Sequence, residues 1–241
     1  PDEEIKARLT LANSILARTK TADAETRELY EQAGLLLHDA KYPETLSYFL
    51  LQQANLLKYS GLKEQMTPLY LAALDKAESA DLPLVAATCY RNLAWDFKRR
   101  RENRQAYVFL RQAVRICIAE DEWQEAVNRL TSLSFLHEDS VESEEFYKNE
   151  LLFALNSSPP LKHRLRLYAL LSRTGGPEAE FWARKGLQES VDFPDERVIL
   201  LKALASELEG KAPTEDVLEL YREAEQIAEP KAFREYYGLE S

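Results

Sequence analysis

A short helical pattern that recurs six times, at intervals of about 40 residues, limits the possible folds more than any other feature of this sequence. In each copy a small residue follows a larger or apolar residue by three positions, and the small residues are Ala33, Ala73, Ala113, Ala154, Gly186 and Ala224. Their separations are 40, 40, 41, 32 and 38 residues. Because a spacing of three is helical, the pattern predicts six helices that play the same part in the fold.

A second helical series precedes the first, with apolar or small residues at relative positions 0, 3, 4 and 7. The clearest copies begin at Tyr90, Leu165 and Leu201, and weaker copies begin at Leu9, Leu50 and Leu130. From the first residue of each copy to the next small residue there are 24, 23, 23, 24, 21 and 23 positions. This nearly constant offset predicts one helix, a short turn and a second helix, six times over.

Glycine and proline fall where such helix pairs need them. Gly61, Gly175, Gly176 and Gly210 lie between the first and second helices, where a left-handed residue ends a helix. Pro43, Pro83, Pro159, Pro160 and Pro194 precede first helices, where proline suits the first turn. No alternating strand pattern and no hairpin signal occurs. The sequence therefore predicts an all-α fold.

The pattern resembles the tetratricopeptide repeat. The match is best in the third pair, whose first helix carries Tyr90, Leu93, Ala94 and Phe97 and whose second helix carries Ala106, Leu110 and Ala113. The resemblance implies a right-handed α-α superhelix, or solenoid, of about six helix-turn-helix repeats in which neighbouring pairs bury each other's apolar faces. The unit of the family has about 34 residues and is stretched here towards 40.

The expected organisation is one solenoid domain over residues 1–241. Its repeats are expected at 5–40, 43–80, 83–120, 123–157, 160–191 and 195–229, followed by a capping helix within 230–241. The end segment is short, charged and aromatic, which suits the polar cap that a solenoid needs.

Composition and motifs argue against several classes of function. A net charge of −10 and a pI near 5.0 predict that the chain does not bind nucleic acid. No apolar run is long enough to span a membrane. The sequence contains no phosphate-binding glycine loop, no nucleophile elbow and no zinc-binding spacing around its two cysteines or three histidines, His38, His137 and His163. We therefore expect no enzyme activity, no catalytic residues, no metal and no cofactor.

The resemblance also implies a concave groove, because in this family the first helix of each pair faces the ligand. The residues expected in this groove are Tyr48, Asn55, Lys58, Arg91, Asn92, Trp95, Lys98, Arg99, Arg166 and Arg173. The set contains five cations beyond Lys58 and no acid, which predicts a basic inner face on an acidic protein. One subclass of the family grips a peptide's terminal carboxylate, but Leu51, Asn128 and Ser132 stand where that subclass has cations. We therefore do not expect a clamp of that type.

The strongest charge run is Lys98, Arg99, Arg100, Arg101 and Arg104. It could simply complement the C-terminus of a helix, or it could form a basic lip for a phosphate, an acidic peptide or nucleic acid. The sequence alone leaves these alternatives open.

The expected function is a non-enzymatic protein–protein interaction scaffold that binds an acidic or extended peptide in the groove. The alternative is a helical sensor module of a larger transcriptional or signalling regulator. The spacing of the two cysteines fits small buried residues in a reducing compartment, and the N-terminus has no apolar stretch of the kind found in signal peptides. We therefore expect a cytoplasmic protein. The sequence begins at Pro1 rather than at a methionine, so a longer parent chain remains an open alternative.

Overall fold

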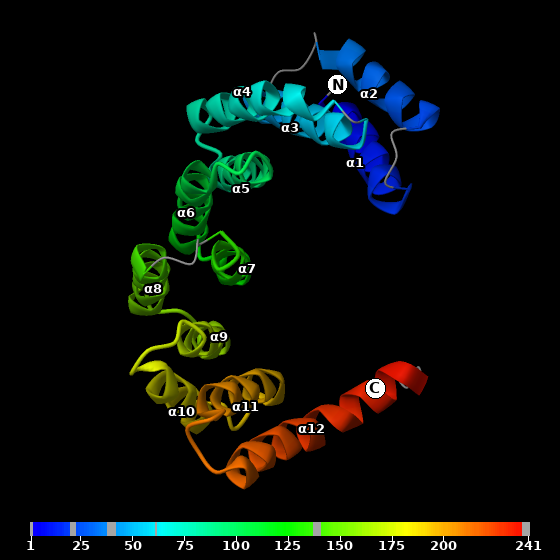
Figure 1. Ribbon diagram of the computed structural model, residues 1–241. Coiled ribbons are helices and arrows are strands. Elements are labelled where there is room, and N and C mark those ends of the chain that lie inside the picture. Colours follow the sequence, from blue (N-terminus) through cyan, green and yellow to red (C-terminus); the bar gives the residue numbers. More distant parts are fainter. Residues whose placement is uncertain (1, 20–22, 38–41, 61, 137–140, 238–241) are drawn as a thin grey trace. The chain divides into compact units, whose positions relative to one another are not determined.

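The computed structural model describes residues 2–19, 23–37, 42–60, 62–136 and 141–237, and 83% of them are helical. No strand occurs in these ranges, which confirms the all-α class (Figure 1). The contacts divide the chain into two compact units, Pro1–Glu122 and Trp123–Ser241. The repeat pattern predicts one continuous solenoid domain over residues 1–241. Whether the two units form such a single solenoid is not tested by these contacts, so this stays a prediction.

The first unit contains six α-helices within its described residues: α1 (Asp2–Thr19), α2 (Ala24–Leu36), α3 (Pro43–Tyr59), α4 (Met66–Ser79), α5 (Pro83–Arg99) and α6 (Asn103–Ala119). A 3₁₀ turn, Lys63–Gln65, precedes α4. Each odd-numbered helix packs against the helix that follows it, and α1 and α5 both also contact α3. The first helices of the pairs therefore share one side of this unit.

The second unit repeats this arrangement with α7 (Trp123–Leu133), α8 (Val141–Asn156), α9 (Leu161–Ser172), α10 (Ala179–Glu189), α11 (Pro194–Leu208) and α12 (Thr214–Tyr237). Here α9 contacts both α7 and α11. The capping helix expected within 230–241 is not a separate helix, because α12 continues from Thr214 to Tyr237. Strong helix formers on both sides of Pro230 favour this continuation.

Proline and left-handed residues set the helix boundaries. Pro43, Pro83 and Pro194 occupy the first turns of α3, α5 and α11, as expected. Gly175, Gly176 and Gly210 have positive φ angles, whereas Gly61 lies outside the described residues. Non-glycine residues also adopt positive φ angles, namely Asp81, Arg101 and Asp121 at the ends of α4, α5 and α6, and Ser158 shortly after α8.

At the ends of α4, α5 and α6 the backbone closes in the same way. The amide of Leu82 donates to the carbonyl of Ala77 at 2.9 Å, and the amide of Glu102 donates to the carbonyl of Phe97 at 3.0 Å. The amide of Glu122 donates to the carbonyl of Cys117 at 2.8 Å. These bonds from the third residue beyond each helix to its last turn satisfy carbonyl groups that the helix leaves open.

The small residues of the repeat lie between packed helices. Their side chains are fully buried in the five alanine copies, Ala33, Ala73, Ala113, Ala154 and Ala224. Around them lie larger buried residues, among them Tyr30, Tyr70 and Leu110. Small side chains at these positions allow helices to approach closely, and the larger ones fill the space beside them.

Ala113→Leu is expected to lower the free energy of unfolding by about 1–3 kcal/mol, because three additional carbons do not fit at a fully buried position in α6. Gln112→Leu, at an exposed position of the same helix, is the control and should change stability little. Urea denaturation of both variants measures the difference. Equal stability of the two variants would show that Ala113 does not lie in a tight contact.

Candidate functional site

Helix α5 buries one face and presents a stripe of large side chains on the other. Ala86, Cys89 and Leu93 are buried in the core of the first unit. On the opposite face, Trp95 is 40% exposed and Leu84 is 43% exposed. Together with Thr88, Arg91 and Lys98 they follow the spacing i, i+4, i+7, i+11 and i+14, which keeps them on a single helix face. We call these five residues the α5 stripe.

Trp95 and Lys98 form the C-terminal end of the α5 stripe. The ammonium nitrogen of Lys98 lies 4.9 Å from the centre of the Trp95 ring, within the range of a cation–π interaction. One turn earlier, Arg91 Nη2 donates to Asn92 Oδ1 at 3.4 Å, and both side chains are half-buried. The structure therefore places Arg91, Trp95 and Lys98 on one face, whereas Asn92 lies at its border. Leu84 was not expected from the sequence, although its helical spacing from Thr88 and Arg91 is the signal that could have indicated it.

Arg99 and Arg100 are held by a carboxylate that the sequence reasoning missed. The side chain of Asp96 is fully buried and forms ion pairs with both guanidinium groups, at 2.7 Å to Arg100 Nη2. The hydroxyl of Thr67 in α4 also donates to this carboxylate. Arg100 Nη2 donates to Thr67 Oγ1 at 2.5 Å, so the network joins α4 to α5. The spacing of three and four residues from Asp96 to the arginines was visible in the sequence, but the burial of Asp96 was not.

The remaining cations of the basic run have other surroundings. Arg101 has a φ of 64° and occupies the left-handed position after α5, and Arg104 is exposed at the start of α6. Part of this run therefore shapes the turn between α5 and α6, and part of it neutralises Asp96.

In α3, the expected groove residues are mainly structural. Tyr48 is half-buried against the core that α1, α2 and α3 share. Asn55 accepts a hydrogen bond from the Tyr70 hydroxyl at 3.0 Å and donates to Gln52 Oε1 at 2.8 Å. Lys58 belongs to α3, but its side chain lies outside the described residues.

The bond between Tyr70 and Asn55 has a counterpart one repeat earlier, where the Tyr30 hydroxyl donates to Asn13 Oδ1 at 2.8 Å. Burial raises the pKa of both tyrosines above the usual value. Each pair therefore connects the second helix of a repeat to the first helix by a neutral hydrogen bond.

Arg166 and Arg173 lie in the second unit and are described apart from the α5 stripe. Arg166 Nε donates to the buried Glu196 carboxylate at 3.1 Å and its Nη1 donates to Gln124 Oε1 at 3.3 Å. It therefore connects α9 to α11 and to α7. Arg173 is exposed and lines a cavity of about 340 Å³, whose other residues include Phe135, Glu144, Tyr147 and Leu170.

Of the three histidines, only His163 falls within the described residues, and it is half-buried in α9. Burial, with the positive charges of Arg166 and Lys162, lowers its pKa, so the imidazole is neutral at pH 7. His38 and His137 lie outside the described residues.

None of the helices in the described part of the chain combines the length and apolar character that a membrane span requires. No protein-family model and no curated protein matches the sequence. Among solved structures, the crystal structure of BtubC (BKLC) from P. vanneervenii aligns with 100% of this chain and with 92% of its own chain. The TM-score of that alignment is 0.42 and the sequence identity is 15%.

Proposed function

We propose that the chain is a non-enzymatic protein–protein interaction module of the tetratricopeptide-like type, a right-handed solenoid that binds an extended, acidic peptide through the α5 stripe. The observation that carries this proposal is the exposure of Trp95. Its neighbours Leu93, Ala94 and Asp96 are almost completely buried, whereas 40% of the Trp95 surface remains accessible. Tryptophan and arginine are the residue types that most often anchor interfaces, and Trp95 and Arg91 are adjacent on this face.

The charges of the first unit are compatible with an acidic partner. Residues 1–122 contain 18 of the 41 acidic residues and 17 of the 31 basic residues, so this unit is almost neutral. Arg99 and Arg100 contribute less than their formal charges because Asp96 pairs with both. The attraction that we propose therefore comes from Arg91 and Lys98 on the α5 stripe, with apolar contact from Trp95 and Leu84.

Trp95→Ala is expected to weaken partner binding by at least about 30-fold, which is the effect of losing an interface anchor worth about 2 kcal/mol. The probe is a fluorescent peptide, obtained by selecting a random peptide library on the immobilised wild-type chain, and its affinity is measured by fluorescence anisotropy. Affinity should also fall as the salt concentration rises from about 50 mM to 500 mM, because the attraction is electrostatic.

Leu71→Ala is the matched control, since Leu71 is 46% exposed on α4 and does not belong to the α5 stripe. Both variants should melt within a few degrees of the wild type because both side chains are on the surface. Selected peptides without an acidic excess, or equal binding to Trp95→Ala and Leu71→Ala, would contradict the proposal. A Trp95→Ala variant that unfolds would show instead that Trp95 belongs to the core.

A further inference from the structure

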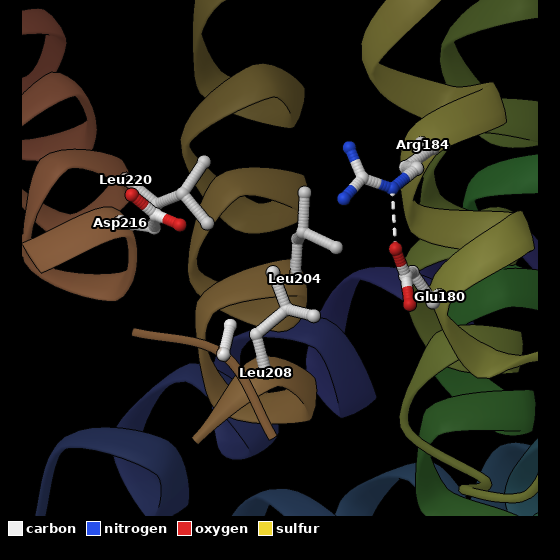
Figure 2. Close-up of a pocket in the computed structure, with 7 residues that line it drawn as sticks. Glu180, Arg184, Leu204, Leu208, Asp216 and Leu220 are labelled. Atoms are coloured by element: carbon white, nitrogen blue, oxygen red, sulfur yellow. Dashed lines mark hydrogen bonds and ion pairs between the residues drawn. The ribbon is translucent and has the colours of Figure 1, made fainter. Parts of the chain in front are cut away.

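A groove in the second unit lies across three helices and takes no part in the α5 stripe. Its volume is about 440 Å³, and it is lined by Glu180, Arg184, Leu204, Leu208, Ala212, Asp216 and Leu220. The six residues labelled in Figure 2 come from α10, α11 and α12 and surround a common space, and Ala212 belongs to the turn between α11 and α12. We call it the α10–α12 groove.

The floor of the α10–α12 groove is apolar. Leu204 and Leu208 lie one turn apart on α11, and Leu220 faces them from α12 (Figure 2). Leu204 is almost fully buried, whereas Leu208 and Leu220 keep part of their surface accessible. An apolar side chain of a partner that covers this accessible leucine surface removes it from water, and this burial would favour binding in the groove.

The rim of the groove is polar and bears negative charge. On one side Arg184 Nε donates to Glu180 Oε1 at 2.6 Å, so these two charges compensate each other. On the other side stands Asp216, and no residue in the described ranges forms an ion pair with its carboxylate. The polar groups therefore stand on opposite sides of a leucine floor and do not converge on one point, as they would around a small polar ligand.

The surrounding unit strengthens this charge. Residues 123–241 contain 23 of the 41 acidic residues and 14 of the 31 basic residues, which accounts for nine of the ten net negative charges. The field near the groove consequently favours a cationic partner and repels an acidic one.

We infer that the α10–α12 groove docks an amphipathic helical segment of a partner protein, with leucine-sized side chains on one face and lysine or arginine beside them. The apolar face would cover Leu204, Leu208 and Leu220, and a flanking cation would pair with Asp216. This site goes beyond the proposed function, because it lies in the other unit and selects the opposite charge. It is independent of Trp95.

The probe for this inference is a synthetic fluorescent peptide of about 18 residues, or about five helical turns, with leucine at every third or fourth position and lysine elsewhere. A second peptide carries glutamate in place of each lysine. Anisotropy at about 150 mM salt, where long-range attraction is screened, should show binding of the lysine peptide and not of the glutamate peptide.

Two matched pairs of variants locate the site. Leu220→Ala should weaken binding of the lysine peptide about tenfold or more, whereas Leu218→Ala, at a position 42% exposed on α12 but outside the groove, should change it less than about twofold. Asp216→Lys and Glu225→Lys change the net charge equally, and both residues are exposed on α12. Of these two variants, only Asp216→Lys should weaken binding of the lysine peptide, also by about tenfold or more.

Equal effects within either pair, or binding of the glutamate peptide, would overturn the inference. So would sedimentation data in which Leu220→Ala abolishes self-association of the chain, because a second copy would then occupy the groove. If Leu220→Ala melts early, the Asp216→Lys and Glu225→Lys pair still decides the question, since both positions are on the surface. Trp95→Ala should bind the lysine peptide like the wild type, which separates this test from that of the α5 stripe.

Discussion

Replacing both Arg99 and Arg100 with alanine is expected to lower the free energy of unfolding by about 3 kcal/mol. The Asp96 side chain is fully buried, and the two guanidinium groups supply the positive charge that compensates its carboxylate. Among the described residues, removing both partners leaves the buried carboxylate with only the Thr67 hydroxyl as a hydrogen-bond donor. Breaking a buried ion pair from one side costs about 3–5 kcal/mol, and the partial exposure of the arginines places this case at the lower end.

The double replacement Arg101→Ala and Arg104→Ala is the control, because it removes the same charge from two exposed neighbours. It should change stability by less than about 1 kcal/mol. Adding Asp96→Asn to the Arg99 and Arg100 replacements should restore part of the loss, since a neutral amide is less costly to bury than a carboxylate. Guanidinium denaturation measures all three proteins. Equal losses in the test and control proteins would rule out a compensated charge at Asp96.

Gly186→Leu is also expected to lower the free energy of unfolding by about 3 kcal/mol. A Cβ atom at Gly186 in α10 would lie 2.5 Å from Leu200 Cδ2 and 2.9 Å from Leu200 Cδ1 in α11. Leu200 is fully buried, so its methyl groups have no accessible surface to move towards. Overpacking of this kind outweighs the gain of up to about 1 kcal/mol that leucine brings over glycine as a helix former.

The interaction between the two positions can be isolated in a double-mutant cycle. Leu200→Ala alone should destabilise by about 2–5 kcal/mol because it leaves a cavity. In the double variant the new leucine can occupy that space, so the combined loss should be at least about 1 kcal/mol smaller than the sum of the two. Thermal unfolding followed by circular dichroism gives the three values. Strictly additive losses would mean that α10 and α11 do not touch at these residues.

The local features of this chain could be predicted from its sequence. Helical periodicity indicated where the helices lie. Their starts were indicated by Pro83 and Pro194, and their ends by the glycines at 175, 176 and 210. These signals are local, because a helix places residues three and four positions apart on one face whatever surrounds it. For the same reason the spacing of Arg91, Trp95 and Lys98 was sufficient to put them on one face of α5.

Burial and pairing between helices depended on the tertiary structure. Arg99 and Arg166 were expected to line a basic groove, yet each is held by a buried carboxylate, Asp96 and Glu196 respectively. In the second case the two partners are 30 positions apart, and no periodicity relates them. The α10–α12 groove likewise takes its residues from three helices and from the turn between α11 and α12, so its shape follows from how those helices pack. Sequence determines which residues share a helix face, but the neighbouring helices decide whether that face meets solvent, an apolar core or an opposite charge.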